Sequence, residues 1–316
     1  MLSFIVKRIL IVIPIILGIT LLTFFLIQLV PGDPAEVYLR LSQVPPTEET
    51  IVAVREELGL DQPLFIQYGQ WLISSTQLDF GVSFVTKKPV LEEVIYYFPE
   101  TLKLTIMASF LTLMISIPVG ILSAFYKNRF FDQVTRFLAL AGNSMPTFWL
   151  GFLLMYVFSL QLGLLPAVGT GSLAHYILPT LTLAIPYISI YSRLLRTSFL
   201  ENMNQPFVLY SSARGIKKRF IYGKHVLKHS LLPVVTGFGV TLGYLLGGTV
   251  IVESVFSLPG VGRYFVSAIL NRDYPVIQFY VLFMAVIFTL IHLIIDVIYA
   301  FLDPRIHIGE EGEQHG

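Results

Sequence analysis

ILIVIPIILGITLLTFFLIQLV, residues 9–30, is long enough as a helix to cross a hydrocarbon core about 30 Å thick. Lys7 and Arg8 precede this run, and basic residues beside an apolar run favour a cytoplasmic N-terminus. A cleaved signal peptide would have a shorter apolar core and a cleavage site of small residues. We therefore expect an uncleaved first membrane span. Its polar or small interruptions are Gly18, Thr20, Thr23 and Gln28.

The composition indicates the same environment for the whole chain. Of its 316 residues, 55% are hydrophobic and 13% are charged, and the mean hydropathy is +0.74. A soluble protein of this length would carry more charge. The formal net charge of +1 gives no support for nucleic-acid binding, and the absence of cysteine excludes disulfides and thiolate metal sites. We expect an all-α polytopic membrane protein.

Further apolar runs along the chain satisfy the same length criterion, which gives six expected crossings and places both termini in the cytoplasm. The charges agree with this topology. Residues 200–230 are basic apart from Glu201, whereas residues 31–100 are mostly acidic, so we expect the former inside and the latter outside. The further runs lie at 102–126, 135–160, 175–197, 231–252 and 276–301.

The outer segment, residues 31–100, is too long for a bare turn and should form a small ordered cap. Pro45-Pro46-Thr47-Glu48-Glu49 predicts a helix start before the amphipathic stretch Thr50 to Leu58. The acidity of the cap is more typical of a solvated helix face than of a site for a cationic ligand or a basic partner. We assign no site there.

Proline and glycine recur within the expected spans, where they favour kinks and close helix contacts. Bendable helices are common in transporters because they let a central path open to either side in turn, although many other polytopic proteins also have them. The best candidates to line such a path are Asn143, Ser144, Met145 and Pro146, since a freed backbone and short polar side chains occur together there. The recurring residues include Pro118, Gly120, Gly142, Pro146, Pro179, Pro186, Gly237, Gly239, Gly243, Gly247 and Gly248.

Ionisable residues at membrane depth are few, chiefly His292 and Asp296 in the last run. Their spacing puts them on one helix face, but Asp296 lies near the cytoplasmic end, where helix packing or pairing with a base is a better explanation than a metal relay. The sequence contains no G-x-x-x-x-G-K-[ST] phosphate loop and no H-E-x-x-H pair. We therefore expect no catalytic site, no metal site and no cofactor on this chain. If it pumps, another subunit hydrolyses the ATP.

PFVLYSSARGIKKRFIYGKHVLKHSLLP, residues 206–233, has the pattern of a docking device for a soluble partner. Phe207, Tyr210 and Ala213 are three apart on one helical face, and Gly215 ends the helix. The alternative is an ordinary cytoplasmic loop, because the positive-inside rule alone would explain the basic charge of this segment equally well. The basic residues of a second amphipathic stretch follow: Lys217, Lys218, Arg219, Lys224 and Lys228.

Several stretches in a fixed order extend over nearly the whole chain. The most specific are GGTVIVESVFSLPGVGRYFVSAILNRDYPVIQ at 247–278 and LDPRI at 302–306. Together with the weaker ones, they resemble the inner-membrane permease subunits of the peptide and nickel branch of ABC importers. The weaker marks are VPGDPA at 30–35, LGLDQPLFIQYGQWL at 58–72, LDFGVSF at 78–84 and SMPTFWLGFLL at 144–154.

The resemblance implies the type I ABC importer permease fold, with six transmembrane helices, an extracytoplasmic cap after the first of them and a cytoplasmic coupling helix. The resulting division is 1–30 for the N-terminus and first helix, 31–100 for the cap, 101–305 for the permease core with its coupling segment 206–233, and 306–316 for a cytoplasmic tail. The coupling segment resembles the EAA loop of the family, although its glutamate is missing. The implied ATPase-coupling residues are Phe207, Tyr210, Ser211, Ala213, Gly215 and Ile216.

The resemblance also implies partners and a mechanism. An extracytoplasmic substrate-binding protein delivers substrate, and two ATP-binding subunits, which hold ATP and Mg, drive alternating access in the cell membrane. A second related permease subunit supplies the other half of the path. Gly260 and Gly262 would lie on the outer side.

The substrate expectation rests on similarity alone. Residues 38–47 and 260–275 resemble the nickel permeases more than the dipeptide ones, so we expect nickel or a nickel chelate, with a di- or oligopeptide as the alternative. An ion-coupled secondary transporter is an alternative of another class. It should show functional charges within the spans and an inverted repeat, and we find neither in the sequence.

Overall fold

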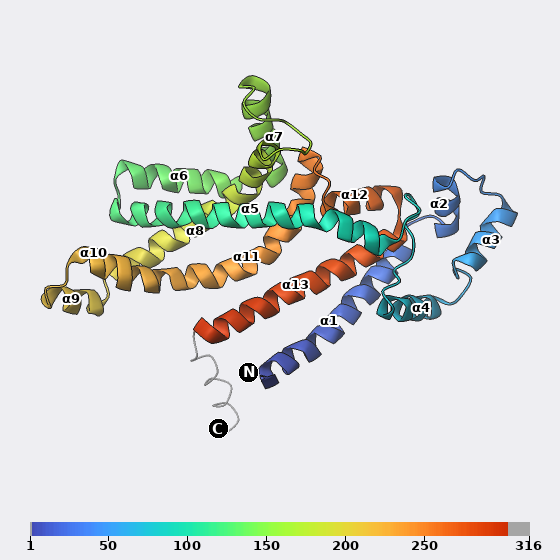
Figure 1. Cartoon of the computed structure of the whole chain (residues 1–316), viewed down its shortest axis with the longest axis horizontal. Coiled ribbons are helices and arrows are strands. Elements are labelled where there is room, and N and C mark those ends of the chain that lie inside the picture. Colours follow the sequence, from blue (N-terminus) through green and yellow to red (C-terminus); the bar gives the residue numbers. More distant parts are fainter. Residues whose placement is uncertain (1, 303–316) are drawn as a thin grey trace. The chain divides into compact units, whose positions relative to one another are not determined.

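The computed structural model describes residues 2–302, with side chains described for residues 10–295. Nearly all of this part of the chain is helical (Figure 1). Within it, five helical segments are long and apolar enough to cross a membrane. They are Leu10–Gln28 of α1 (Leu2–Gln28), α5 (Val90–Phe125), α8 (Ala174–Met203), the continuous stretch Lys218–Phe256, and Tyr274–Ile295 of α13 (Tyr274–Leu302).

A sixth apolar segment is broken. The expected span 135–160 is two helices, α6 (Phe130–Ser144) and α7 (Thr147–Leu154), the second continued by the π-helix η1 (Met155–Gln161), and the pair is bent by 112°. Met145 is extended at the break, with ψ 131°. Proline lacks an N–H and disfavours the helical conformation at the preceding residue, so Pro146 accounts for the bend. Counted as one span, the pair brings the number of candidate membrane helices in the described residues to six.

The chain forms two compact units, which we describe separately. The first comprises residues up to 99 together with 260–294, and the second comprises 100–259 with the described residues from 295 onward. In the second unit α8 lies in contact with α6, α7 and α11 (Leu227–Phe256).

Glycines let these helices approach closely, as is common in membranes. A Cβ at Gly120 of α5 would lie 2.8 Å from the backbone oxygen of Ser192 in α8. A Cβ at Gly142 of α6 would lie 2.5 Å from the Ser189 hydroxyl, also in α8. The close helix contacts predicted from the glycine pattern are therefore confirmed at these positions.

Polar side chains also join the helices of the second unit. Arg196 of α8 donates from Nη2 to Oδ2 of Asp132 in α6 at 2.8 Å and from Nε to Oδ1 at 2.5 Å. Asp132 is fully buried, and a two-pronged pairing of this kind compensates a buried carboxylate for lost water. Between α8 and α11, the hydroxyls of Tyr191 and Thr241 lie 2.5 Å apart.

In the first unit, α1 is followed by the short helices α2 (Pro34–Leu41), α3 (Glu48–Glu57) and α4 (Leu64–Thr76). Ala35, Leu39 and Val54 form a small core between α2 and α3. The predicted helix start near Pro45 is confirmed, because Thr47 caps α3 by accepting from the Thr50 backbone N–H, and the Thr50 hydroxyl accepts from the Thr47 backbone N–H in return.

The loop before α5 is tied to the start of α13. The buried carboxylate of Asp273 accepts from the Ser83 hydroxyl at 2.5 Å and from the backbone N–H groups of Phe84 and Val85 at 3.0 and 3.3 Å. Burial raises the pKa of Asp273, and these hydrogen bonds oppose the rise. The remaining helix of the unit, α12 (Val261–Asn271), leads into this site.

Candidate functional site

The expected coupling segment begins with a short helix, α9 (Pro206–Ala213). Pro206 occupies its first turn, where the missing N–H costs nothing. After the helix, Gly215 has φ +78°, and the backbone N–H groups of Gly215 and Ile216 donate to the carbonyls of Ser212 and Ser211 at 3.0 and 3.2 Å. This paired closure is the Schellman motif, which favours glycine at the left-handed position. The prediction that Gly215 ends the helix is confirmed.

The side chains of α9 divide into an inner and an outer set. Val208 is buried and Phe207 is half-buried against a cluster that contains Phe199 and Val226. Leu209 and Tyr210 are 72% and 69% exposed. The expected common face of Phe207 and Tyr210 is therefore split. A helix turns about 100° per residue, so residues three apart differ by about 60°, which is enough to turn one inward and the other outward.

The other expected coupling residues lie nearer the surface. Ala213, Gly215 and Ile216 are exposed, and Ser211 is half-buried. Leu209 is not among the expected coupling residues, although a large apolar side chain on a short helix beside a basic run was the available signal.

The basic stretch after Gly215 is the start of a long helix. α10 (Lys218–Phe220) and the π-helix η2 (Ile221–Val226) run directly into α11. Since a π-helix pairs residues five apart, the fully buried Ile221 and Val226 lie on one face. The expected second amphipathic stretch is confirmed, and its basic residues are exposed: Lys217, Lys218, Arg219, Lys224 and Lys228.

The four candidate path residues lie at the bend between α6 and α7. Asn143, Ser144 and Pro146 are exposed, and Met145 is half-buried. The preceding Gly142 is buried against α8, which fixes the end of α6 beside that helix. The structure brings the four together at one break, and their role in a path stays a prediction.

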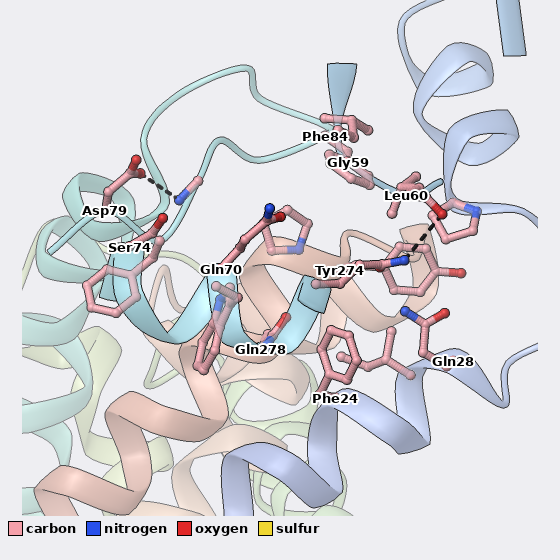
Figure 2. Close-up of a pocket in the computed structure, with 18 residues that line it drawn as sticks. Phe24, Gln28, Gly59, Leu60, Gln70, Ser74, Asp79, Phe84, Tyr274 and Gln278 are labelled. Carbon is pink, nitrogen blue, oxygen red and sulfur yellow. Dashed lines mark hydrogen bonds between the residues drawn. The ribbon is translucent and has the colours of Figure 1, made fainter. Parts of the chain in front are cut away.

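A cavity of about 290 Å³ in the first unit was not predicted from the sequence. Its lining comes from the end of α1, the start of α2, residues 58–60, α4, the loop at 79–84 and the start of α13 (Figure 2). The wall combines aromatic rings with amide side chains. Among the lining residues are Phe24, Gln28, Gln70, Trp71, Phe84, Tyr274 and Gln278.

Metal-binding groups are not assembled in the described part of the chain, where no three His, Asp or Glu residues are placed to hold an ion. The imidazole Nδ1 of the exposed His292 lies 2.8 Å from the Phe288 carbonyl oxygen. The side chain of Asp296 and residues 303–306 of the LDPRI motif fall outside the described residues.

Comparisons with known proteins give matches in the N-terminal part of the chain and in the remainder. A family model described as "Binding-protein-dependent transport system inner membrane component" matches residues 116–308, and a model for the N-terminal part of such membrane components matches residues 1–105. The glutathione transport system permease protein GsiC of Salmonella choleraesuis is 42% identical over 307 residues, which are 97% of this chain and 99% of that protein. Its counterpart in Escherichia coli strain K12 is 39% identical over the same shares of the two chains.

A solved structure gives a more distant match. A chain of the MetNI methionine ABC transporter, in an inward-facing conformation, has a TM-score of 0.54 and 19% sequence identity. The match covers 66% of this chain and 96% of that one. At this identity the likeness shows a shared fold.

Proposed function

Because the chain belongs to the family of inner-membrane components of binding-protein-dependent transport systems, we propose that it forms half of the translocation path of an importer for peptides. It is a permease subunit of an ABC importer and not an enzyme, and nucleotide binding resides on partner ATPases. Partners of this family include ATPase and substrate-binding components in general. The alternative of an ion-coupled secondary transporter is thereby set aside.

The substrate class rests on one observation, the 42% identity over 97% of the chain to permeases named for glutathione. Glutathione is a tripeptide, so these names favour the peptide alternative over the nickel expectation drawn from residues 38–47 and 260–275. Nothing in the names of these relatives supports nickel. We take short peptides as the substrate class.

The proposed assembly contains this chain, a second related permease, two ATP-binding subunits and an extracytoplasmic binding protein. In the proposed orientation, the basic residues around α9 and α10 face the cytoplasm together with both termini, and the acidic residues 31–100 face outward. The charge asymmetry of the two segments supports this orientation.

Coupling to an ATPase is proposed for α9. Its exposed Leu209 and Tyr210 offer an apolar and aromatic contact of the kind that anchors protein interfaces. On its inner side, Val208 and Phe207 pack in a cluster with Ala124 of α5, Phe199 of α8 and Val226 of the stretch leading into α11. A push on α9 would therefore reach three membrane helices through close-packed side chains.

The proposed path element is the bend at residues 143–146. Two helices meet there at 112° beside a backbone freed by Pro146, and such breaks are tolerated at membrane depth where they line a cavity or are buried in protein. The exposed Asn143 and Ser144 would offer their polar groups to a passing peptide.

Uptake measurements test the proposed function. Cells with and without this gene, with all partner subunits present in both, are given a labelled tripeptide, a labelled dipeptide and labelled nickel. We expect loss of peptide uptake and unchanged nickel uptake. Loss of nickel uptake alone would reject the peptide assignment, and peptide uptake that survives loss of the partner ATPases would reject ATP-driven transport.

A further inference from the structure

A cluster of charged side chains where α6 meets α8 in the second unit carries more positive charge than its one carboxylate compensates. Both oxygens of the buried Asp132 accept from Arg196, and one of them also accepts from the backbone N–H of Asn128. Nε of Arg136 is 3.8 Å from Oδ1 of Asp132, beyond hydrogen-bond distance. Arg193 has no carboxylate within ion-pair distance among the described residues. These four side chains, three positive and one negative, therefore have a net charge of +2.

The two uncompensated arginines line the same recess. Arg136 of α6 and Arg193 of α8 are both exposed, with 49% of the Arg136 side chain open to solvent. The recess has a volume of about 10 Å³, room for about one water molecule, so a larger anion would lie at its mouth. Its lining also includes Ser123 of α5, Thr135 and Ser192. An anion there would contact two guanidinium groups without disturbing the buried ion pair.

The position of the recess along the helices corresponds to the headgroup layer of a bilayer. In the proposed orientation, the turn at 126–129 between α5 and α6 faces the cytoplasm. At about 1.5 Å per residue, Arg136 lies about 10 Å along the helix from Arg129. The headgroup layer is about 5–7 Å thick on each side, so this places the recess near the boundary of the hydrocarbon core. A charged side chain at this depth is costly unless it is paired.

Exposed apolar side chains adjoin the recess on α6. Leu140 lies about one turn beyond Arg136 on the same face, toward the middle of the membrane, and Phe137 is next to Arg136. These two apolar side chains are 61% and 69% exposed. Cationic groups at headgroup depth, followed by an apolar surface at greater depth, match the amphipathic structure of a phospholipid.

We propose that Arg136 and Arg193 bind the phosphate of an anionic phospholipid in the cytoplasmic leaflet, with an acyl chain along Leu140 and Phe137. Guanidinium groups bind phosphate through paired hydrogen bonds. The net charge of +2 favours phosphatidylglycerol over phosphatidylcholine, because choline compensates the phosphate charge of the latter. The bound lipid would contact α6 and α8 together, and α8 leads to α9. This inference rests on the proposed orientation and does not depend on the transported substrate.

The test titrates the purified full chain in detergent with dioleoyl-phosphatidylglycerol or dioleoyl-phosphatidylcholine and counts bound lipid by native mass spectrometry. The two lipids have the same acyl chains, and we expect the anionic one to bind about fivefold or more tightly. The double variant Arg136→Gln, Arg193→Gln should bind phosphatidylglycerol about tenfold or more weakly. The charge-matched control Arg214→Gln, Arg219→Gln changes two exposed arginines outside the recess, so its loss should be less than about threefold. Equal binding of the two lipids, or an equal loss in the control, would overturn the proposal.

Two soluble probes distinguish other sources of the anion. Inorganic phosphate and a tripeptide with a free carboxylate, each at the concentration of the lipid, should leave phosphatidylglycerol bound. Displacement by phosphate would indicate a site for soluble anions. Displacement by the tripeptide, but not by its C-terminal amide, would assign the arginines to a transported peptide. Either displacement would reject the lipid assignment.

Folding of the double variant is checked by its melting temperature. Neither side chain donates a hydrogen bond within the described part of the chain, so we expect a value near that of the wild type. If the yield of folded protein falls, Arg136→Lys with Arg193→Lys replaces the double variant. These changes keep the charge and remove the paired hydrogen bonds, so binding of phosphatidylglycerol should weaken by about threefold or more, and unchanged binding would contradict the proposal. Each of these outcomes is independent of the uptake result.

Discussion

At the scale of single residues, Gly215 is the position where backbone conformation alone determines the residue type. Its φ of +78° is left-handed, yet a Cβ built on it meets no atom within 4 Å. The requirement for glycine is therefore one of backbone strain and not of space. The sequence predicted this residue correctly, because a glycine between a short helix and a basic run is a common helix end.

We expect Gly215→Ala to lower peptide uptake. Alanine in the left-handed region costs about 1–2 kcal/mol, which corresponds to a drop of about five- to thirtyfold in the population of the native turn. Gly215→Asn should lose less, since asparagine adopts this conformation more readily. Gly223→Ala is the matched control, because Gly223 is helical with open space around its Cβ. Uptake at equal membrane expression is the measurement, and equal uptake by all three variants would contradict the docking role.

A second residue-scale prediction concerns Asp273, which joins the 83–85 loop to α13. Asp273→Ala leaves buried backbone and hydroxyl donors unpaired, which should destabilise the first unit by about 3 kcal/mol. The exposed Asp79 bonds one backbone N–H, so Asp79→Ala should cost about 1 kcal/mol or less. Thermal unfolding followed by tryptophan fluorescence compares the two. Equal shifts in melting temperature would show that the Asp273 contacts add no more stability than the single hydrogen bond of Asp79.

At the scale of elements, apolar length predicted where the membrane helices lie but not where they break or begin. The run 135–160 passes the length criterion although it contains Asn143 and Ser144, so apolar length alone did not reveal the bend, whereas the kink expected from Pro146 is confirmed. The last part of the coupling segment was separated from the next span because its lysines interrupt the apolar pattern. In the structure they project outward from a continuous helix whose inner face is buried through Ile221 and Val226.

Two glycines, Gly120 in the second unit and Gly18 in the first, give a comparison that tests helix packing in the second unit. Gly120→Ala would place a Cβ 2.8 Å from a backbone oxygen of α8 and 3.0 Å from Cβ of Leu195, so the helices must separate. We expect a cost of about 1–3 kcal/mol, seen as a lower melting temperature in detergent. Gly18→Ala, in a helix with nothing within 4 Å, should be neutral or stabilising by up to about 1 kcal/mol. A Gly120→Ala protein as stable as the wild type would argue against close packing of α5 on α8.

The outer face of α9 gives a second comparison at this scale. Tyr210→Ala and Leu209→Ala remove exposed side chains, so they should leave the melting temperature nearly unchanged while each lowers ATP-dependent uptake by about tenfold or more. Val208→Ala removes buried atoms and should lower the melting temperature instead. Co-purification with the ATPase subunits is the direct measurement. Wild-type co-purification and uptake by both surface variants would move the coupling site elsewhere.

At the scale of the whole molecule, the sequence and the structure differ most in what they reveal about sites. The segment proposed for coupling, residues 206–233, is contiguous in sequence, so its glycine and aromatic residues were visible at once. The cavity in the first unit is assembled from residues between 24 and 278, and no local pattern links Trp71 to Gln278. A site of that kind becomes visible only when the chain is folded.

The distribution of charge predicts which side of the membrane each segment faces, and the geometry of the chain alone does not determine it. The absence of cysteine makes it directly measurable, since any introduced thiol is the only one in the chain. Glu49 and Lys217 are both exposed and lie on the acidic and basic segments. In sealed right-side-out vesicles, a membrane-impermeant maleimide should label the Glu49→Cys variant and not the Lys217→Cys variant, because the positive-inside rule places the basic segment in the cytoplasm. Inverted vesicles should give the opposite pattern, and permeabilised vesicles should label both, which controls for accessibility. The reverse result would place α9 on the outer side, where no ATP-driven partner is available, and would rule out its coupling role.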